Sequence, residues 1–301
     1  MSDRPEKTAV LLLNHFVDRA LVDLYGQLGA DCADTRDVFL LSDRTRASVS
    51  TARLPRGSRE FTFTTRDLTN LGYPGKGGSI GSREGLRNMT LGNADLPVLL
   101  FFKHHPDYSR IWVVEYDVRY SGNWESLFAE FDGNDADLLG TTLQRRDQCP
   151  KWSHWHSLDL PTVDTDPGNW VRGFFPIYRM SARALVALDR AYKAGCRGHM
   201  EALLPTVLVS QGHRIEDIGG LGEFVQPGNE NRFYQNQPAT NRLSPGTFVY
   251  RPVLECVGDQ PNTLWHPVKT PRPRWRNGLK RLLSTAATIV RDQLRDTRRR
   301  S

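Results

Sequence analysis

Residues 110–118, RIWVVEYDV, decide the fold class of this chain. Four consecutive apolar residues, 111–114, are typical of a strand that is buried on both faces of a sheet. Glu115 and Asp117 follow, and the alternation of an extended chain places both side chains on one side of the pleat. Ligands of open α/β sheets bind beyond the carboxyl ends of the strands. The two acids therefore suit a divalent cation or a sugar hydroxyl, although acids that only cap a strand or form salt bridges would show the same pattern.

The segments around this strand predict an α/β fold with a mostly parallel central sheet flanked by helices. Residues 8–14, 16–29 and 37–41 read as strand, helix and strand, which is a right-handed βαβ unit. Ser181 is a good N-cap for the helix that follows it. The other expected strands are 61–65, 137–142, 174–178 and 248–255, and the other expected helices are 96–102, 125–131, 182–194 and 198–208.

Composition indicates a soluble globular protein. Of the 301 residues, 39% are hydrophobic and 25% are charged, which argues against disorder or a coiled coil. No apolar run approaches the ~20 residues that cross a bilayer, and residues 8–14 read as a first strand rather than as part of a signal peptide. The four cysteines form no CxxC pair, so reduced cytosolic thiols are expected rather than a zinc ribbon or a disulfide framework.

The basic charge of the chain belongs to its last thirty residues. The whole chain carries +6. Ten Lys and Arg against two Asp give residues 272–301 a charge of +8, which leaves −2 for residues 1–271. We therefore expect a catalytic domain over 1–271 and a basic tail over 272–301. An acidic body weakens a nucleic-acid interpretation.

The tail has the pattern of an amphipathic cationic helix over residues 278–295. Such a helix suits an anionic membrane surface, or it packs on the body or on another subunit. We expect a cytoplasmic protein that is peripheral on the inner face of a membrane. The apolar positions recur in steps of three to four residues, at Leu279, Leu282, Leu283, Ala286, Ile289, Val290 and Leu294.

Two loops carry further candidate residues. Residues 67–82 contain LGYPGKGGSIGS, whose spacing matches neither a Walker A motif nor a dinucleotide fingerprint, so a flexible loop is favoured over a phosphate cradle. Residues 151–157, KWSHWHS, combine flat aromatic faces with hydrogen-bonding groups, as sugar-binding pockets do. The acceptor-binding candidates there are Trp152, His154 and Trp155; core packing is the equal alternative, and two His at HxH spacing make a metal site the weakest.

The order of these motifs resembles the GT-A class of nucleotide-sugar glycosyltransferases. Glu115-Tyr116-Asp117 stands where that class carries its DxD motif, and His266 in TLWHPVK follows the last expected strand. The second half, with FFPIYRMSARAL before the helix that contains Glu201, is similar to core-2-type N-acetylglucosaminyltransferases and protein xylosyltransferases. The resemblance implies that Glu201 is the general base of an inverting transfer. On the residues alone, Glu201 is a first-turn acid that the helix dipole favours.

The resemblance implies two ways of holding the donor diphosphate, one with a metal ion and one without. In the metal-using version, Asp117 and His266 hold Mn²⁺ or Mg²⁺, while Glu115, Asp117 and Lys269 face the donor. The core-2-type enzymes imply a metal-independent version, in which Lys269, Arg272 and Arg274 hold the diphosphate. Asp43, at the end of the second strand, is a candidate for the donor ribose or base, or an ordinary turn residue.

The resemblance implies a hexosyl- or pentosyltransferase of polysaccharide biosynthesis. It would move a sugar from a nucleotide-diphosphate donor to a hydroxyl of a glycan or of a lipid-linked saccharide. Two alternatives belong to other classes: a non-catalytic carbohydrate-binding or scaffold protein with a degenerate acidic triplet, and a nucleic-acid-associated protein that uses the basic tail.

Overall fold

A computed structural model describes residues 7–45, 50–76, 92–163 and 166–269. The described residues from Lys7 to Val268 form one compact unit. The predicted helix over 278–295, Arg272 and Arg274 lie outside the described residues, so the domain boundary at 271 stays a prediction. None of the four cysteines, all of which lie in the described residues, forms a disulfide bond. Within the described ranges, no helix has the length and apolar character that crossing a bilayer requires.

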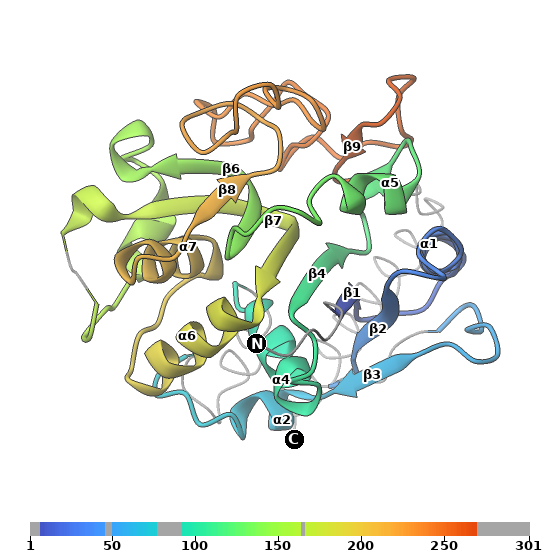
Figure 1. Ribbon diagram of the computed structural model, residues 1–301, viewed down its shortest axis with the longest axis horizontal. Coiled ribbons are helices and arrows are strands. Elements are labelled where there is room, and N and C mark those ends of the chain that lie inside the picture. The colour runs from blue at the N-terminus through green and yellow to red at the C-terminus, as the bar shows by residue number, and fades with distance from the viewer. Residues whose placement is uncertain (1–6, 46–49, 77–91, 164–165, 270–301) are drawn as a thin grey trace, which may run out of the picture. The chain divides into compact units, whose positions relative to one another are not determined.

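A seven-stranded mixed sheet forms the centre of the compact unit (Figure 1). Six of its strands run parallel to one another, and β7 is antiparallel to both of its neighbours, β4 and β6. The predicted class, an α/β fold with a mostly parallel sheet, is therefore confirmed. In spatial order the strands are β3 (Glu60–Phe63), β2 (Asp37–Asp43), β1 (Thr8–Asn14), β4 (Arg110–Glu115), β7 (Val171–Ser181), β6 (Leu138–Arg145) and β8 (Ile215–Asp217).

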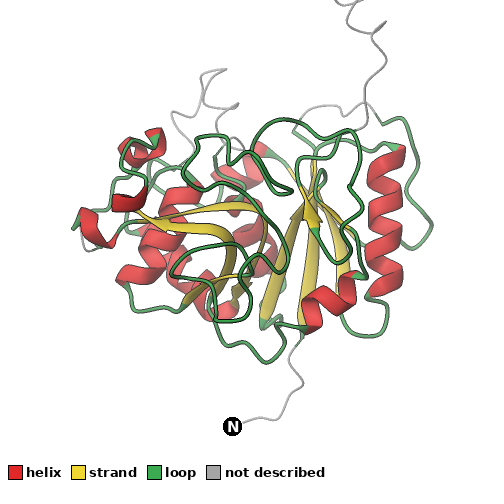
Figure 2. Cartoon of the chain, turned by 90° about the horizontal axis from the view of Figure 1, so that it is seen from above, coloured by secondary structure: helices red, strands yellow, loops and turns green. Residues whose placement is uncertain are grey.

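Helices cover both faces of the sheet, as Figure 2 shows. Apolar side chains of α1 and α5 pack with one face of the strands, and those of α2, α4, α6 and α7 pack with the other. The helices are α1 (Arg19–Asp31), α2 (Thr65–Thr69), α4 (Asp95–His104), α5 (Trp124–Ala129), α6 (Ala182–Lys193) and α7 (Met200–Ser210). A second, two-stranded sheet pairs β5 (Arg119–Tyr120) with β9 (Leu264–Trp265).

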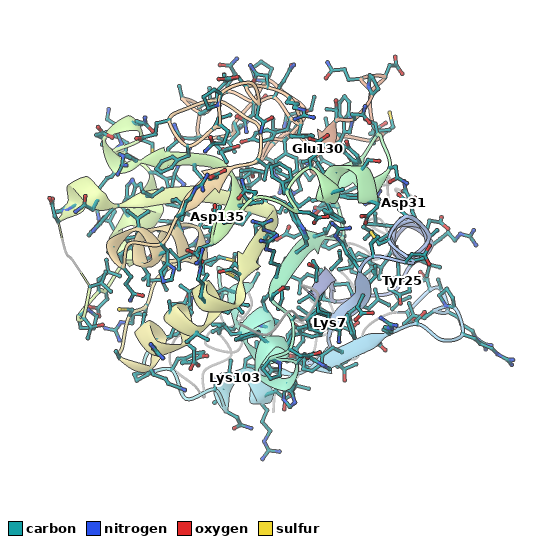
Figure 3. All side chains as sticks on the ribbon, in the orientation of Figure 1. Lys7, Tyr25, Asp31, Lys103, Glu130 and Asp135 are labelled. Atoms are coloured by element: carbon teal, nitrogen blue, oxygen red, sulfur yellow. The ribbon has the colours of Figure 1, made fainter. Side chains whose placement is uncertain are left out.

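Side-chain caps set where the helices begin. The Ser181 hydroxyl accepts a hydrogen bond from the Ala184 amide at 3.1 Å, which confirms the predicted N-cap of α6. At α1 the Asp18 carboxylate accepts from the Leu21 amide at 2.9 Å, so this helix begins at Arg19 rather than at residue 16. Lys7, labelled in Figure 3, directly precedes β1. Its ammonium forms an ion pair with the carboxylate of Asp107 at 2.7 Å.

The prediction of a strand over 248–255 is wrong. This stretch forms only isolated bridges, from Phe248 to His266 and from Leu254 to Val268. Pro252 between them has no N–H to give to a ladder, and the Tyr250 amide donates instead to the Arg242 carbonyl at 3.0 Å. The residues after β8 therefore follow an irregular path until β9, and that path carries His266 back to the end of β4.

The lysine of the glycine-rich stretch is used inside the protein. Lys76 and Asp95 form an ion pair at 2.9 Å, with both side chains fully buried. The Lys76 ammonium also donates to the Asn93 side chain at 3.0 Å and to the Gly198 carbonyl at 3.4 Å. Lys76 therefore connects this stretch to the start of α7 and does not offer its charge to a phosphate.

Candidate functional site

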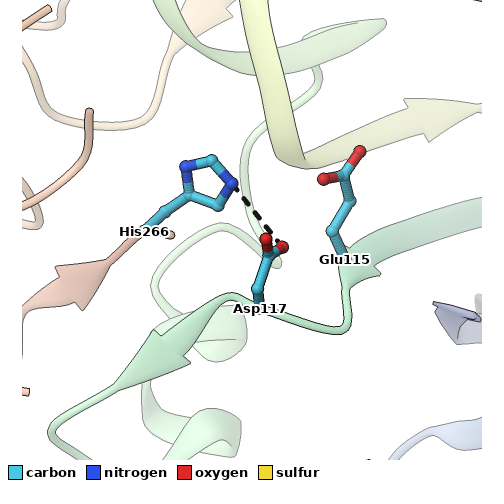
Figure 4. Close-up of side chains that lie close together, drawn as sticks. All are labelled: Glu115, Asp117 and His266. Carbon is cyan, nitrogen blue, oxygen red and sulfur yellow. Dashed lines mark ion pairs between the residues drawn. The ribbon is translucent and has the colours of Figure 1, made fainter. Parts of the chain in front are cut away.

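The structure brings Glu115, Asp117 and His266 together at the carboxyl end of β4 (Figure 4). One ligand atom from each residue lies within 4.8 Å of the others. Glu115 ends β4, but Asp117 lies in the turn that follows, which the Val118 amide closes on the Glu115 carbonyl at 3.0 Å. The turn, and not the alternation of one strand, therefore places the two acids side by side. Asp117 and His266 are only 4% and 6% exposed.

The imidazole of His266 presents one nitrogen to this cluster. Its Nδ1 lies 2.9 Å from the Val249 carbonyl. Since a carbonyl only accepts, Nδ1 carries the hydrogen, and Nε2 faces Asp117, 3.6 Å from Oδ1. A main-chain carbonyl that fixes the tautomer in this way is typical of metal-binding histidines. Two atoms that bind one ion at about 2.1 Å lie roughly 3 Å apart, and the 3.6 Å between His266 Nε2 and Asp117 Oδ1 is close to that separation. The donor set of two carboxylates and one imidazole therefore fits a divalent ion such as Mn²⁺.

Arg119 adds a positive charge beside the acids. Its Nη1 donates to the carbonyls of Tyr116 and Val118, each at 2.8 Å. Burial lowers the pKa of Arg119, and the charge of Asp117 opposes that effect. No pattern in the sequence marked this residue. Lys269, which the sequence did mark, is half-buried and is the last described residue, so its donor role stays a prediction.

Three aromatic rings lie next to the acids. His15 and Phe16 follow β1, and Tyr116 lies between the two acids in the chain. The ring centroids are 4.8 to 5.5 Å apart, and the rings meet edge to face. Asp43 ends β2 at the same sheet edge, where its carboxylate accepts a hydrogen bond from the Thr45 amide at 2.8 Å. The parallel strands thus end in rings and polar groups that suit a nucleoside.

A second cluster surrounds Glu201, the predicted base. Glu201 lies in the first turn of α7, and its amide donates to Nδ1 of the N-cap His199 at 3.4 Å. Its side chain is 22% exposed. Burial raises the pKa of the carboxyl to about 7, although the charge of Arg172 and a hydrogen bond from the Phe175 amide oppose the shift. A carboxylate with a pKa near neutrality is what general-base catalysis requires.

The structure brings two of the three predicted acceptor residues to this cluster. The ring of His154 stacks on that of His199, with centroids 3.9 Å apart, and Trp152 packs edge-on against His154 at 5.0 Å. Burial lowers the pKa of both histidines, so they are neutral near pH 7. Trp155 is 3% exposed, and its indole N–H donates to the Cys149 carbonyl at 2.9 Å. Trp155 therefore belongs to the interior.

Strand β7 connects the two clusters. The Phe174 ring lies 5.2 Å from the His266 ring, while the Phe175 amide donates to Glu201. The pairing of β4 with β7 ends at Val114 and Ile177, so this part of β7 runs past the end of β4. Consecutive residues of one strand thus contact the acid–histidine cluster on one side and the predicted base on the other.

The raised pKa of Glu201 predicts how stability depends on pH. Between pH 4.5 and about 7 the unfolded chain loses this proton while the folded protein keeps it, so the contribution to stability falls as the pH rises. At pH 8 the cost reaches up to about 3 kcal/mol. We expect Glu201→Gln to raise the free energy of unfolding at pH 8 and to leave it unchanged at pH 4.5. Denaturant unfolding of Glu201→Gln and of the exposed control Glu255→Gln at both pH values tests this; equal pH dependence in wild type and Glu201→Gln would contradict it.

No protein-family model and no curated protein matches this chain. Among solved structures it is similar to the bifunctional glycosyltransferase WbbM, with a TM-score of 0.36 and 8% identity over 71% of this chain and 39% of WbbM. It is also similar to mouse xyloside xylosyltransferase 1, with a TM-score of 0.33 and 14% identity over 70% of this chain and 85% of that one. The chain thus spans about two fifths of the length of WbbM. Both proteins are glycosyltransferases.

Proposed function

We propose that this chain is a glycosyltransferase that moves a sugar from a nucleotide-diphosphate donor to a hydroxyl of a glycan or of a lipid-linked saccharide. One observation carries the proposal: a carboxylate–imidazole cluster ends the central strand, and β7 connects it to a carboxyl group with a pKa of about 7. The first group suits a donor diphosphate, and the second suits a hydroxyl that must lose a proton.

On the donor side, Asp117 and His266 would hold Mn²⁺ or Mg²⁺, with Glu115 as the third candidate ligand. Such an ion supplies positive charge to the leaving diphosphate. Arg119 adds to that charge from the protein, and Lys269 is proposed to do so as well. The rings of Phe16 and Tyr116 offer faces to the base, and Asp43 offers a carboxylate to the ribose.

On the acceptor side, Glu201 takes the proton of the attacking hydroxyl. The acceptor oxygen then bonds to the anomeric carbon as the bond from that carbon to the diphosphate breaks. A single base on the side opposite the leaving group gives inversion. Trp152 offers the acceptor a flat face, and His154 offers it a hydrogen-bonding edge. The basic tail remains a proposed contact with an anionic membrane surface.

A thermal-shift screen of nucleotide sugars, with and without Mn²⁺, tests the donor site. A cognate donor at about one hundred times its Kd should stabilise the protein by about 2.7 kcal/mol. We expect the shift to require Mn²⁺, to disappear with EDTA and to be lost in His266→Phe, which keeps a ring but removes both nitrogens. The exposed His156→Phe is the matched control.

Two outcomes would change the proposal. A donor shift of equal size in EDTA would favour the metal-independent version with Lys269 and Arg272. Donor binding without any transfer to glycan acceptors, and without donor hydrolysis, would favour the non-catalytic carbohydrate-binding alternative.

A further inference from the structure

Arg172 is a buried cation whose hydrogen-bond partners are neutral. It lies on β7 opposite Gln144 of β6 and is 7% exposed. Its Nε donates to the Gln144 side-chain oxygen at 3.0 Å, and Nη2 donates to the same oxygen and to the Pro238 carbonyl at 3.4 Å. These bonds fix the plane of the guanidinium without neutralising it. Burial lowers the pKa of Arg172, which records the cost of keeping the charge there.

The remaining nitrogen of this guanidinium stays available. Among the described residues, none accepts a hydrogen bond from Nη1 of Arg172, and none forms an ion pair with Arg172. A nitrogen without a hydrogen-bond partner is either fully buried or accessible to solvent. Nη1 of Arg172 is not fully buried, so solvent reaches it. The charges of Cys149 and Glu201 act on Arg172 but form no ion pair with it, and a buried cation that forms no ion pair costs several kcal/mol. An anion at Nη1 would recover part of that cost.

The surroundings of Arg172 point to the acceptor. The guanidinium carbon lies 5.1 Å from the Trp152 ring centroid, and the Arg172 charge acts on both Glu201 and His154. A group bound at Nη1 therefore lies beside the carboxyl group that is proposed to deprotonate the acceptor. His154 and His199 are neutral near pH 7 and do not compete for an anion.

We propose that Arg172 binds a carboxylate or phosphate group of the acceptor, so that the acceptor is an acidic saccharide. This inference rests on the proposed function, because it places the anionic group next to the hydroxyl that Glu201 activates. The two N–H groups of Nη1 remain, and a charge-assisted hydrogen bond from them suits an oxygen of either group. A uronic acid would supply a carboxylate, and a sugar phosphate or a lipid-linked phosphate would supply the other anion.

Binding of simple anionic probes to the full chain tests the inference without a known acceptor. The probes are inorganic phosphate and methyl glucuronide, each at 50 mM, against sodium chloride at matched ionic strength and against neutral methyl glucoside. The readout is the change in melting temperature of wild type, Arg172→Met, Arg172→Lys and the exposed control Arg190→Met, each relative to its own value in chloride. Because the basic tail is the same in all four proteins, differences between them report on the arginine that was changed.

We expect phosphate, methyl glucuronide or both to raise the melting temperature of wild type and Arg190→Met by at least one degree. The shift should fall by at least half in Arg172→Lys and vanish in Arg172→Met. Which probe acts shows whether the group is a phosphate or a carboxylate. Equal responses in wild type and Arg172→Met, or no response to either anion, would overturn the inference and leave Arg172 as a residue that limits the pKa of Glu201. Since no donor takes part, such a result is independent of the donor screen that tests the glycosyltransferase proposal.

Discussion

Asp117→Asn should lower the rate of sugar transfer by at least about 10³-fold while the protein stays folded. Asn has the same size as Asp but loses the negative charge beside His266. An ion that neutralises a leaving diphosphate contributes several kcal/mol, and each 1.36 kcal/mol is a factor of ten in rate. The measurement is transfer, or donor hydrolysis, at saturating Mn²⁺, with thermal denaturation of the same preparation to show that the fold is kept.

The matched control is Asp259→Asn, which makes the same chemical change at an exposed site. We expect this variant to turn over like the wild type. If Asp117→Asn keeps wild-type turnover, the cluster of Glu115, Asp117 and His266 is not the donor site, and the donor must bind elsewhere.

Glu201→Gln should lower kcat by roughly 10²- to 10⁴-fold, the range that a positioned general base supplies. The amide keeps the size of the side chain but cannot take a proton. Because the proposed donor site lies on the other side of β7, the KM for the donor should change little. In the wild type, kcat should rise with pH through about 7, where Glu201 loses its proton. That dependence should be absent from the residual activity of the variant.

Glu255→Gln, at an exposed position, is the control for the charge change. A loss of donor affinity as large as the loss of kcat would assign Glu201 to donor binding. An unchanged kcat would mean that another group takes the proton, and the neutral His154 would be the first to test.

The sequence predicted those parts of the fold that short-range patterns determine. The apolar run over 8–14 and the Ser181 cap each appear where local chemistry places them. The end of β4 was correctly expected to carry polar residues, because Glu115 directly follows four apolar positions. The return of His266 to that end depends on an irregular path of about fifty residues, and only the resemblance to glycosyltransferases indicated it.

Contacts between distant segments explain what the sequence did not show. Arg172 looks like one more polar residue at the start of a strand, and only its pairing with Gln144 and the approach of Trp152 reveal a buried cation. Arg119 is similar, since its role depends on the turn that Asp117 makes. Trp155 illustrates the converse. Its indole N–H donates to a main-chain carbonyl inside the protein. The sequence shows only that several aromatic residues lie close together, and it does not distinguish an interior ring from one that faces a ligand.

Neighbouring residues of β7 contact the acid–histidine cluster and the cluster around Glu201. This closeness limits how the length of β7 can change. Phe174 contacts His266 with its ring, and the next residue, Phe175, donates its main-chain amide to Glu201, while successive side chains of a strand point to opposite sides. Inserting or deleting one residue there would reverse the direction of every side chain beyond it, whatever the amino acids. Substitutions in this segment can be compensated by their neighbours, but a change in length cannot.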